Sequence, residues 1–277
     1  MDKPVGPTSH DVVARARQAL GERSIGHTGT LDPFASGLLV LLVGKATRVA
    51  RFLDGLAKTY LATARLGTRT TTDDLTGEPV GVPFTGTLPD RAALAEGLAG
   101  FVGRQDQVPP AFSARRQDGE RAYAIARRGE VVLLPPAAVT VHAAELLDLQ
   151  EGSATFRVTV STGTYVRALA RDLGERLGVG AHLTALRRES IGGLRVEDAV
   201  GLDALGPGTA LWPLGAVLSH LPRVVLDAAT REDVGHGRPV PGTTAGTTVL
   251  VATDGDVIAI AEGDGGWLRP TVVLAAS

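Results

Sequence analysis

The sequence predicts an α+β fold, in which helices flank a mixed or antiparallel sheet and a small all-β domain follows at the C-terminal end. Strand-like and helix-like segments intermingle without the regular rhythm of parallel βαβ units. Residues 247–274 form short β-rich runs separated by Asp-Gly and Gly-Gly turns. The length of 277 residues lies near the size at which one core stops growing, which favours a large and a small domain.

The first expected element is a helix at residues 8–20. A Thr-x-x-Asp capping box marks its start, and Gly21 marks its end. A turn rich in glycine and threonine, GHTGTLDPFASG at residues 26–37, comes next, and the apolar run after it predicts a buried strand near 38–43. The inward face of the helix consists of Val12, Val13, Ala16 and Leu20.

The middle of the chain predicts two strands in which every second side chain is buried. The buried side of the first strand carries Tyr60, and that of the second carries Phe156. A polar loop and a helix follow the first strand, and the second strand leads into an amphipathic helix that ends at Gly178. The expected bounds are 58–67 and 153–160 for the strands, 68–79 for the loop, and 89–99 and 166–178 for the helices.

We expect a first domain at residues 1–205, a connection rich in Pro and Gly at 206–221, and the β domain at 222–277. The formal net charge is −2, and the last of these parts contributes −3, with four Arg against seven Asp or Glu. Because local patches matter more than totals for binding phosphates, the segment 115–128 is notable, with five Arg against two acidic residues. Charge alone leaves open whether this segment binds an anionic partner or is a solvated helix face.

Several classes of chemistry lack their sequence signals. The chain has no cysteine, its six histidines do not show metal-ligand spacing, and no G-x-S-x-G motif is present. GLLVLLVGKAT differs from a P-loop, because six residues separate Gly37 from Gly44 and Ala46 follows Lys45. The first residues, MDKPVGPTS, do not show the charged and then apolar order expected of a signal peptide, and no apolar run reaches about 20 residues. We therefore expect a cytoplasmic protein that needs no metal, cofactor or membrane.

What remains is a possible site around one acid, Asp32, in the turn before the apolar run. An Asp-Pro pair in a glycine-rich turn usually has a structural role, in which the carboxylate accepts a nearby backbone N–H. A glycosidase needs two acting carboxylates, and only Asp73 and Asp74 could supply the second one through the fold. The residues by themselves leave these alternatives open.

Four segments resemble the bacterial tRNA pseudouridine-55 synthases of the TruB type. The segment HTGTLDPFASGLLVLLVGKATR resembles the catalytic motif of this family, and DKPVGPTSHDVV resembles its N-terminal motif. KTYLATARLGTRTTTDDLTGEP resembles the Tyr-containing strand and its loop, and STGTYVRALARDLGERLGVGAHLTALRR resembles the Arg-containing segment. The C-terminal strands are similar to a PUA-type RNA-binding domain. The resemblance implies a pseudouridine-synthase-like fold and conversion of uridine to pseudouridine in the T-loop of tRNA.

The resemblance also implies roles for three residues. The reaction breaks the N1–C1′ bond of uridine, turns the uracil and joins C5 to C1′, so it needs a nucleophile, a proton acceptor and a dry pocket. In the family pattern Asp32 is the nucleophile, Arg167 pairs with it and keeps it ionised, and Tyr60 stacks on the base. Without the resemblance, the sequence alone predicts that Tyr60 is an aromatic residue of the core and that Arg167 faces the solvent.

Other residues are expected to contact RNA, because they fall on matching motifs. His27 is expected to contact a flipped-out base. Asp74 takes the position of the family's loop acid, although Thr71 occupies a position where an aspartate is common. Residues 109–129 resemble an insertion that embraces the substrate, which we place at about 85–130. In it, Phe112 replaces the usual Tyr. The remaining expected contacts are Arg115, Arg116, Tyr165 and Lys3.

The expected partner is the T-arm stem-loop of tRNA, recognised by a monomer without a guide RNA. The GERAY motif at residues 119–123 resembles that of the stand-alone bacterial enzymes rather than that of their guide-dependent relatives. Such a protein could also assist the folding of tRNA, because extruding a base opens the RNA. The alternative from another class is a protein that binds and remodels tRNA without catalysis.

Overall fold

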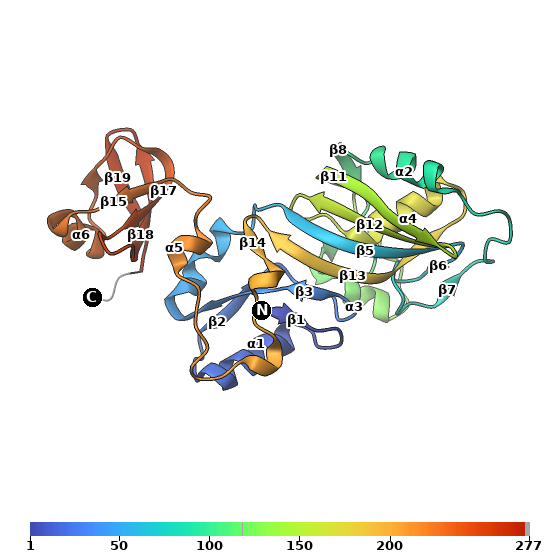
Figure 1. Ribbon diagram of the computed structural model, residues 1–277, viewed down its shortest axis with the longest axis horizontal. Coiled ribbons are helices and arrows are strands. Elements are labelled where there is room, and N and C mark those ends of the chain that lie inside the picture. The colour runs from blue at the N-terminus through green and yellow to red at the C-terminus, as the bar shows by residue number, and fades with distance from the viewer. Residues whose placement is uncertain (118, 275–277) are drawn as a thin grey trace.

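The computed structural model describes residues 1–117 and 119–274, and a long mixed sheet dominates it (Figure 1). Its strands are β1 (Asp2–Lys3), β3 (Ser36–Leu38), β5 (Lys58–Leu66), β8 (Gly103–Gln107), β11 (Ala137–Gln150), β12 (Ser153–Val160), β13 (Ala181–Ile191) and β14 (Leu194–Arg195). They are ordered β1-β3-β13-β5-β12-β11-β8, and β14 pairs with β13. Only the β3–β13 pair is parallel among these, so the predicted mixed sheet is confirmed.

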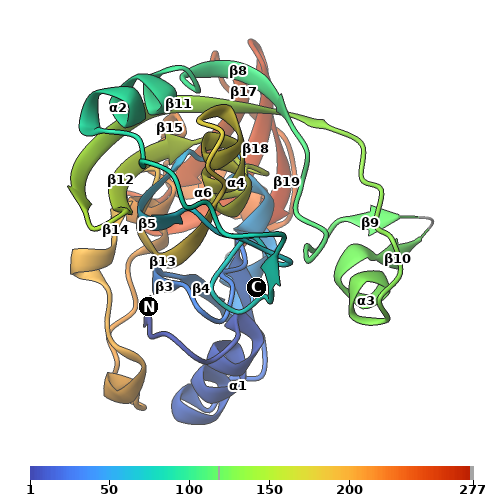
Figure 2. The ribbon, with the colours of Figure 1, turned by 90° about the vertical axis from the view of Figure 1, so that its right-hand side faces the viewer.

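Two helices cover one face of this sheet. Helix α2 (Arg91–Ala99) packs on β11, and α4 (Val166–Arg176) packs on β13 and β5 (Figure 2). Their apolar side chains join those of the strands in the main core, where Leu94, Leu173 and Phe156 are almost completely buried. The opposite face of β5 and β12 is polar, with Thr–Thr pairs across the strands. The site is therefore built where one covered face of the sheet meets the N-terminal segments.

The N-terminal segments form a second, smaller layer. Helix α1 (Ser9–Leu20) has the expected capping box between Thr8 and Asp11, and Gly21 ends it in the left-handed conformation. The helix packs beside β2 (Ile25–Thr28), which pairs with β4 (Val40–Val43). The 3₁₀ helix η1 spans Gly44–Phe52.

The strand expected near residues 38–43 differs from the prediction, because two sheets share it. The chain leaves the central sheet after Leu38 and continues as β4 in the small sheet. Between them, the N–H of Leu39 donates to the carbonyl of Met1 at 2.8 Å. Gly37 has a φ of 103° and lies against the backbone of Arg188, where a Cβ atom would overlap it.

The expected insertion at about 85–130 divides between two parts of the structure. Helix α2 and strand β8 belong to the central layers, so only the chain between β8 and β11 projects away from them (Figure 2). This projection contains β9 (Arg116–Gln117), β10 (Glu120–Arg121) and α3 (Ala122–Arg127). In the expected loop at 68–79, β6 (Arg69–Thr70) and β7 (Pro79–Val80) form a short hairpin.

The C-terminal part is a five-stranded sheet with one helix that the sequence did not predict. The strand order is β15-β17-β18-β19-β16, and the turns at Gly255 and Gly265 have positive φ, as Asp-Gly and Gly-Gly turns require. The elements are β15 (Arg223–Val225), α6 (Ala228–Gly235), β16 (Val240–Pro241), β17 (Ala245–Val251), β18 (Val257–Asp264) and β19 (Trp267–Val273). The division of the chain at 205 and 222 stays a prediction.

The C-terminal sheet shares a core with the N-terminal layer. Leu38 and Val40 belong to one cluster of buried side chains with Val249, Ile260 and Val272. Between β14 and this sheet the chain forms the short helices η2 (Val196–Asp198) and η3 (Leu202–Ala204), which precede the expected connection at 206–221, and α5 (Leu214–Val217), which lies within it.

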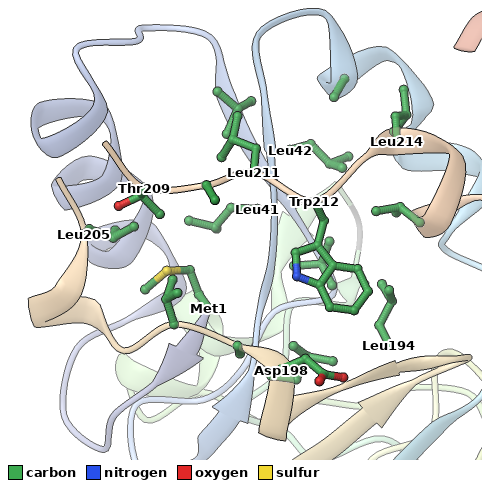
Figure 3. A pocket seen from close by; sticks show the side chains of 18 of the residues that line it. Met1, Leu41, Leu42, Leu194, Asp198, Leu205, Thr209, Leu211, Trp212 and Leu214 are labelled. Carbon is green, nitrogen blue, oxygen red and sulfur yellow. The ribbon is translucent and has the colours of Figure 1, made fainter. Parts of the chain in front are cut away.

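The connection also borders an apolar cavity of about 210 Å³ (Figure 3). Met1, Leu41 and Leu194 line it together with Trp212, which is 49% exposed. No residue of the predicted site lines this cavity.

Within the described part of the chain, no helix combines the length and apolar character needed to cross a membrane.

Candidate active site

The turn that carries Asp32 joins β2 to β3 and is held by residues from two other elements. The hydroxyl of Ser9, at the start of α1, accepts from the N–H of Leu31 at 2.9 Å and donates to its carbonyl at 3.1 Å. The guanidinium of Arg188, only 1% exposed in β13, donates to the carbonyls of Gly29 and Leu38. Hydrogen bonds therefore fix the turn on both sides of the acid.

The carboxylate of Asp32 faces Arg167, near the start of α4. The distance from Arg167 Nε to Asp32 Oδ2 is 3.0 Å. The side chain of Arg167 is 4% exposed, whereas that of Asp32 is 38% exposed. Within the described residues, the backbone of the turn bonds the carbonyl of Asp32 rather than its carboxylate. An approaching ligand can thus reach the acid while its cationic partner stays buried.

Arg167 is also held by two loops. It donates from Nη1 to the carbonyl of Thr72 at 2.8 Å and from Nη2 to the carbonyl of Phe112 at 2.9 Å. Its Nη1 lies 3.4 Å from Oδ2 of Asp74. A buried guanidinium needs such partners, because leaving its N–H groups unpaired would be costly. Phe112 thus contributes a backbone carbonyl, and the structure brings Asp32, Asp74 and Arg167 together around one guanidinium.

Asp74 and its neighbour point in different directions. Oδ1 of Asp74 accepts from the hydroxyl of Thr72 at 2.7 Å and from the N–H of Thr76 at 2.9 Å. Asp73 instead pairs with Arg171 at 3.0 Å. Of the two acids that the sequence left open, Asp74 therefore approaches Asp32, but the two share an arginine and Asp74 is 4% exposed. This arrangement does not resemble the two accessible carboxylates of a glycosidase.

Burial raises the pKa of Asp32 above its usual value of 3.8. The Arg167 guanidinium acts in the opposite direction and lowers this pKa, the charge of Asp74 raises it, and the ammonium of Lys3 lowers it slightly. The site therefore holds a carboxylate that is harder to ionise than an exposed one and is sensitive to its charged neighbours.

This raised pKa predicts the acid side of the pH–rate profile. If the Asp32 anion is the active form, kcat/KM should fall as the pH falls through a pKa above 3.8. Asp74→Asn removes a charge that raises the pKa of Asp32, so the fall should move to lower pH in that variant. The rate of the catalysed reaction as a function of pH measures this, with circular dichroism at each pH as the control for unfolding. An inflection at or below 3.8 in the wild type would contradict the prediction.

Tyr60 lies on β5, and His27 lies on β2, the strand that leads into the turn. Tyr60 is 7% exposed and belongs to the main hydrophobic cluster together with Leu31 and Phe34, which flank Asp32 closely in sequence. His27 is half-buried, and its Nδ1 has no hydrogen-bond partner in the described residues. Burial, followed by the neighbouring Arg188 and His10, lowers the pKa of His27, which favours a neutral ring.

Tyr165 is held by a residue that the sequence reasoning missed. Gln107, at the end of β8 and 3% exposed, accepts from the N–H of Tyr165 at 2.8 Å and donates to its carbonyl at 3.1 Å. These bonds fix the backbone two residues before Arg167. A polar residue at the end of an edge strand carries no sequence signal for this role.

Lys3 does not lie where an RNA contact requires it. Its side chain is fully buried, and Nζ donates to the carbonyls of Pro4 and Pro7 at 2.8 Å each. An ammonium in this position cannot meet a phosphate, so we no longer assign Lys3 to the RNA surface. Lys3 instead fixes the loop before α1 and adds a positive charge near Asp32.

Arg115 and Arg116 are exposed at the base of the projection. Nη1 of Arg116 donates to the carbonyl of Gly119 at 3.1 Å. The guanidinium of Arg115 lies beside Gly163, in the loop that leads to α4. The guanidinium groups of Arg115 and Arg116 thus place positive charge near the site, on an exposed segment that a large ligand can reach.

In the part of the chain that the structure describes, no three His, Asp or Glu side chains are grouped as they would be around a metal ion.

Two family profiles match the chain in succession. The N-terminal domain of the TruB family pseudouridylate synthases matches residues 17–166, and the tRNA pseudouridylate synthase B C-terminal domain matches residues 167–229. The protein named tRNA pseudouridine synthase B from Thermobifida fusca is 46% identical over 100% of this chain and 98% of its own length. The protein of that name from Leifsonia xyli subsp. xyli is 44% identical over 100% and 95%.

Solved structures are similar over nearly the whole chain. The archaeal box H/ACA sRNP Nop10–Cbf5 complex contains a chain that is 26% identical, with a TM-score of 0.72, covering 98% of this chain and 83% of its own. An H/ACA RNP bound to a substrate RNA containing 2′-deoxyuridine shares the fold at 24% identity and the same TM-score, with coverages of 99% and 84%. The family profiles and the full-length relatives together show that this chain belongs to the TruB family of pseudouridylate synthases.

Proposed function

We propose that this pseudouridine synthase, an isomerase, acts on the T-loop uridine at position 55 of tRNA and uses Asp32 as its catalyst. The observation that carries the proposal is the half-exposed carboxylate on a fixed turn, 3.0 Å from a buried guanidinium. Isomerisation of a base needs one well-held acid rather than a redox centre. Relatives that match the full chain are named tRNA pseudouridine synthase B, which supports tRNA as the substrate.

In this proposal each side chain has one task. Asp32 acts on the nucleoside while the N1–C1′ bond breaks, and Arg167 favours its anionic form by charge and hydrogen bonding. Tyr60, on the buried face of β5, stacks on the uracil and keeps it in place while it turns. After C5 has joined C1′, the C5 proton passes to a base and from it to solvent, N1 takes up a proton in its place, and the site releases pseudouridine.

The target uridine must leave the RNA stack before Asp32 can reach it. A base inside a stem-loop is inaccessible to a carboxylate on a fixed turn, so we propose base flipping. The neutral ring of His27, half-buried on β2, is suited to pack against an extruded base. The opening of the loop that this requires also supports a role in tRNA folding.

We propose that the projection between β8 and β11 contacts the RNA. We also propose that the protein is a cytoplasmic monomer that recognises tRNA without a guide RNA. The exposed arginines at the base of the projection lie beside the loop that leads to α4. Identity to proteins named tRNA pseudouridine synthase B, at 46%, is well above that to the H/ACA chains, at 24–26%. The C-terminal sheet, with its net charge of −3, is proposed to be a PUA-like domain whose main role is not the docking of a phosphate backbone.

The double substitution Arg115→Glu and Arg116→Glu should weaken tRNA binding. Loss of two phosphate contacts should lower the slope of log K against log salt concentration by about 2, because each contact contributes about 0.9. Filter binding at several salt concentrations measures this slope. The matched control is Arg115→Lys with Arg116→Lys, which keeps the charge. Affinity equal to wild type at low salt in the Glu variant would remove this segment from the RNA surface.

The proposed substrate is tested with two tRNA transcripts labelled with [5-³H]uridine. One has uridine at position 55, and the other has cytidine there. We expect tritium release and a pseudouridine at this position from the first transcript alone, without added metal or nucleotide. Equal release from both would place the target elsewhere in tRNA. No release from either, with tight binding of both, would favour a protein that binds and remodels tRNA without catalysis.

A further inference from the structure

Helix α4 carries a second arginine that is built into the same region and has no role in the reaction as proposed above. Arg167 and Arg171 are one helical turn apart, so their side chains leave α4 on the same side. The side chain of Arg171 is 15% exposed. Its Nη1 donates to Oδ2 of Asp73 at 3.0 Å, its Nη2 to the carbonyl of Val108 at 2.8 Å, and its Nε to Oδ1 of Asp172 at 2.8 Å.

The two arginines hold the same two segments of chain. In the loop between β6 and β7, Arg167 contacts Thr72 and Asp74, and Arg171 contacts the residue between them, Asp73. In the segment after β8, Arg171 contacts Val108, and Arg167 contacts Phe112. Each of the two segments therefore contacts α4 through both arginines. Every group that bonds Arg167, apart from Asp32, lies within four positions along the sequence of a group that bonds Arg171.

The backbone of Asp73 shows why the contact with Arg171 matters. Its φ is 59°, in the left-handed region that side chains other than those of Gly, Asn and Asp seldom adopt. Its carbonyl accepts from the N–H of Leu183 at 3.0 Å, and its carboxylate is held by Arg171. This conformation directs the Thr72 carbonyl and the Asp74 carboxylate, on either side, toward Arg167. Relaxation of Asp73 would turn both away.

We infer that Arg171, through its pair with Asp73, is a positioning residue that sets the Arg167 guanidinium against Asp32. The inference rests on the proposed function, because it assigns Arg171 to the same reaction. Arg171 acts on the loops and does not touch Asp32, so it affects the reacting groups only through Arg167. Displacement of a reacting group by about 1 Å is enough to cost on the order of 100-fold in rate.

The test compares Arg171→Gln, Asp73→Asn and the double variant, in single-turnover reactions with saturating tRNA. Asn keeps the shape of Asp and tolerates the left-handed conformation, so Asp73→Asn removes the charge of the pair alone. We expect Arg171→Gln to lower the rate constant about 10- to 100-fold, since Arg167 moves, with little change in the Kd for tRNA. Asp73→Asn should lower it less, and adding Arg171→Gln to it should cost less than it does in the wild type.

The matched control is Arg157→Gln, which breaks the Arg157–Glu189 pair at 2.8 Å on the polar face of the sheet. A merely structural role for Arg171 would lower the melting temperature and leave the pH profile unchanged. Positioning instead predicts that the fall in rate at low pH moves upward in Arg171→Gln and not in Arg157→Gln. If the wild type is active and Arg171→Gln behaves like the control, the inference is wrong. A wild type that makes no pseudouridine would overturn the proposed function itself.

Discussion

Replacing Asp32 with asparagine is expected to reduce pseudouridine formation on the order of 10⁴-fold, the scale seen when a member of a catalytic group is removed. The amide has almost the same size and can still accept a hydrogen bond from Arg167, but it has no negative charge to act on the nucleoside. Tritium release under single-turnover conditions measures the loss. Binding of tRNA should be nearly unchanged, because the exposed surface around the turn is the same.

A suitable control for this variant is Asp2, in strand β1. Asp2 also pairs with an arginine, Arg187, at 2.8 Å, and its side chain is 33% exposed, close to the 38% of Asp32. Asp2→Asn should retain most of the activity. Near-normal turnover by Asp32→Asn would refute the mechanism, and equal losses in both variants would point to a general effect of breaking an Asp–Arg pair.

Arg167→Gln is expected to have two large effects. Catalysis should fall about 10³-fold or more, because the charge that favours the Asp32 anion is gone and the group that orients it is shorter. Stability should fall as well, by about 3–5 kcal/mol, because Asp74 would keep a buried charge without its cationic partner. Single-turnover kinetics measures the first effect, and urea unfolding measures the free energy of unfolding.

The two effects of Arg167→Gln can be separated by a second substitution. Asp74→Asn removes the buried charge that lost its partner, so the double variant should recover much of the free energy of unfolding. It should not recover catalysis, because the cation beside Asp32 is still missing. Recovery of both would mean that Arg167 acts through stability alone, and recovery of neither would mean that the ion pair with Asp74 is of minor importance.

Local signals in the sequence predicted the elements that depend on local chemistry. The capping box at Thr8 and the glycine after Leu20 define α1 almost to the residue, and the alternation around Tyr60 defines β5. Strands β11 and β13 were not expected. Each has two register shifts, and a bulge breaks the two-residue alternation by which a strand is recognised.

The site was less accessible to sequence reasoning than the fold. The pairing of Asp32 with Arg167 joins a turn to a helix far along the chain, and only the family resemblance indicated it. Arg188 looks like a surface residue in sequence, yet it is buried and holds the turn. Lys3 shows the converse error, since a basic residue in a recognised motif predicts an RNA contact, but packing hides its side chain.

The shared core beneath the C-terminal sheet limits how this chain can have changed over time. Leu38 and Val40, which pack with Val249, Ile260 and Val272, lie directly after the turn that carries Asp32. Loss or exchange of the C-terminal sheet would expose these side chains unless new residues covered them at once. Its inner face is therefore tied to the history of the turn that carries Asp32, whereas its outer, acidic surface is under no such packing constraint.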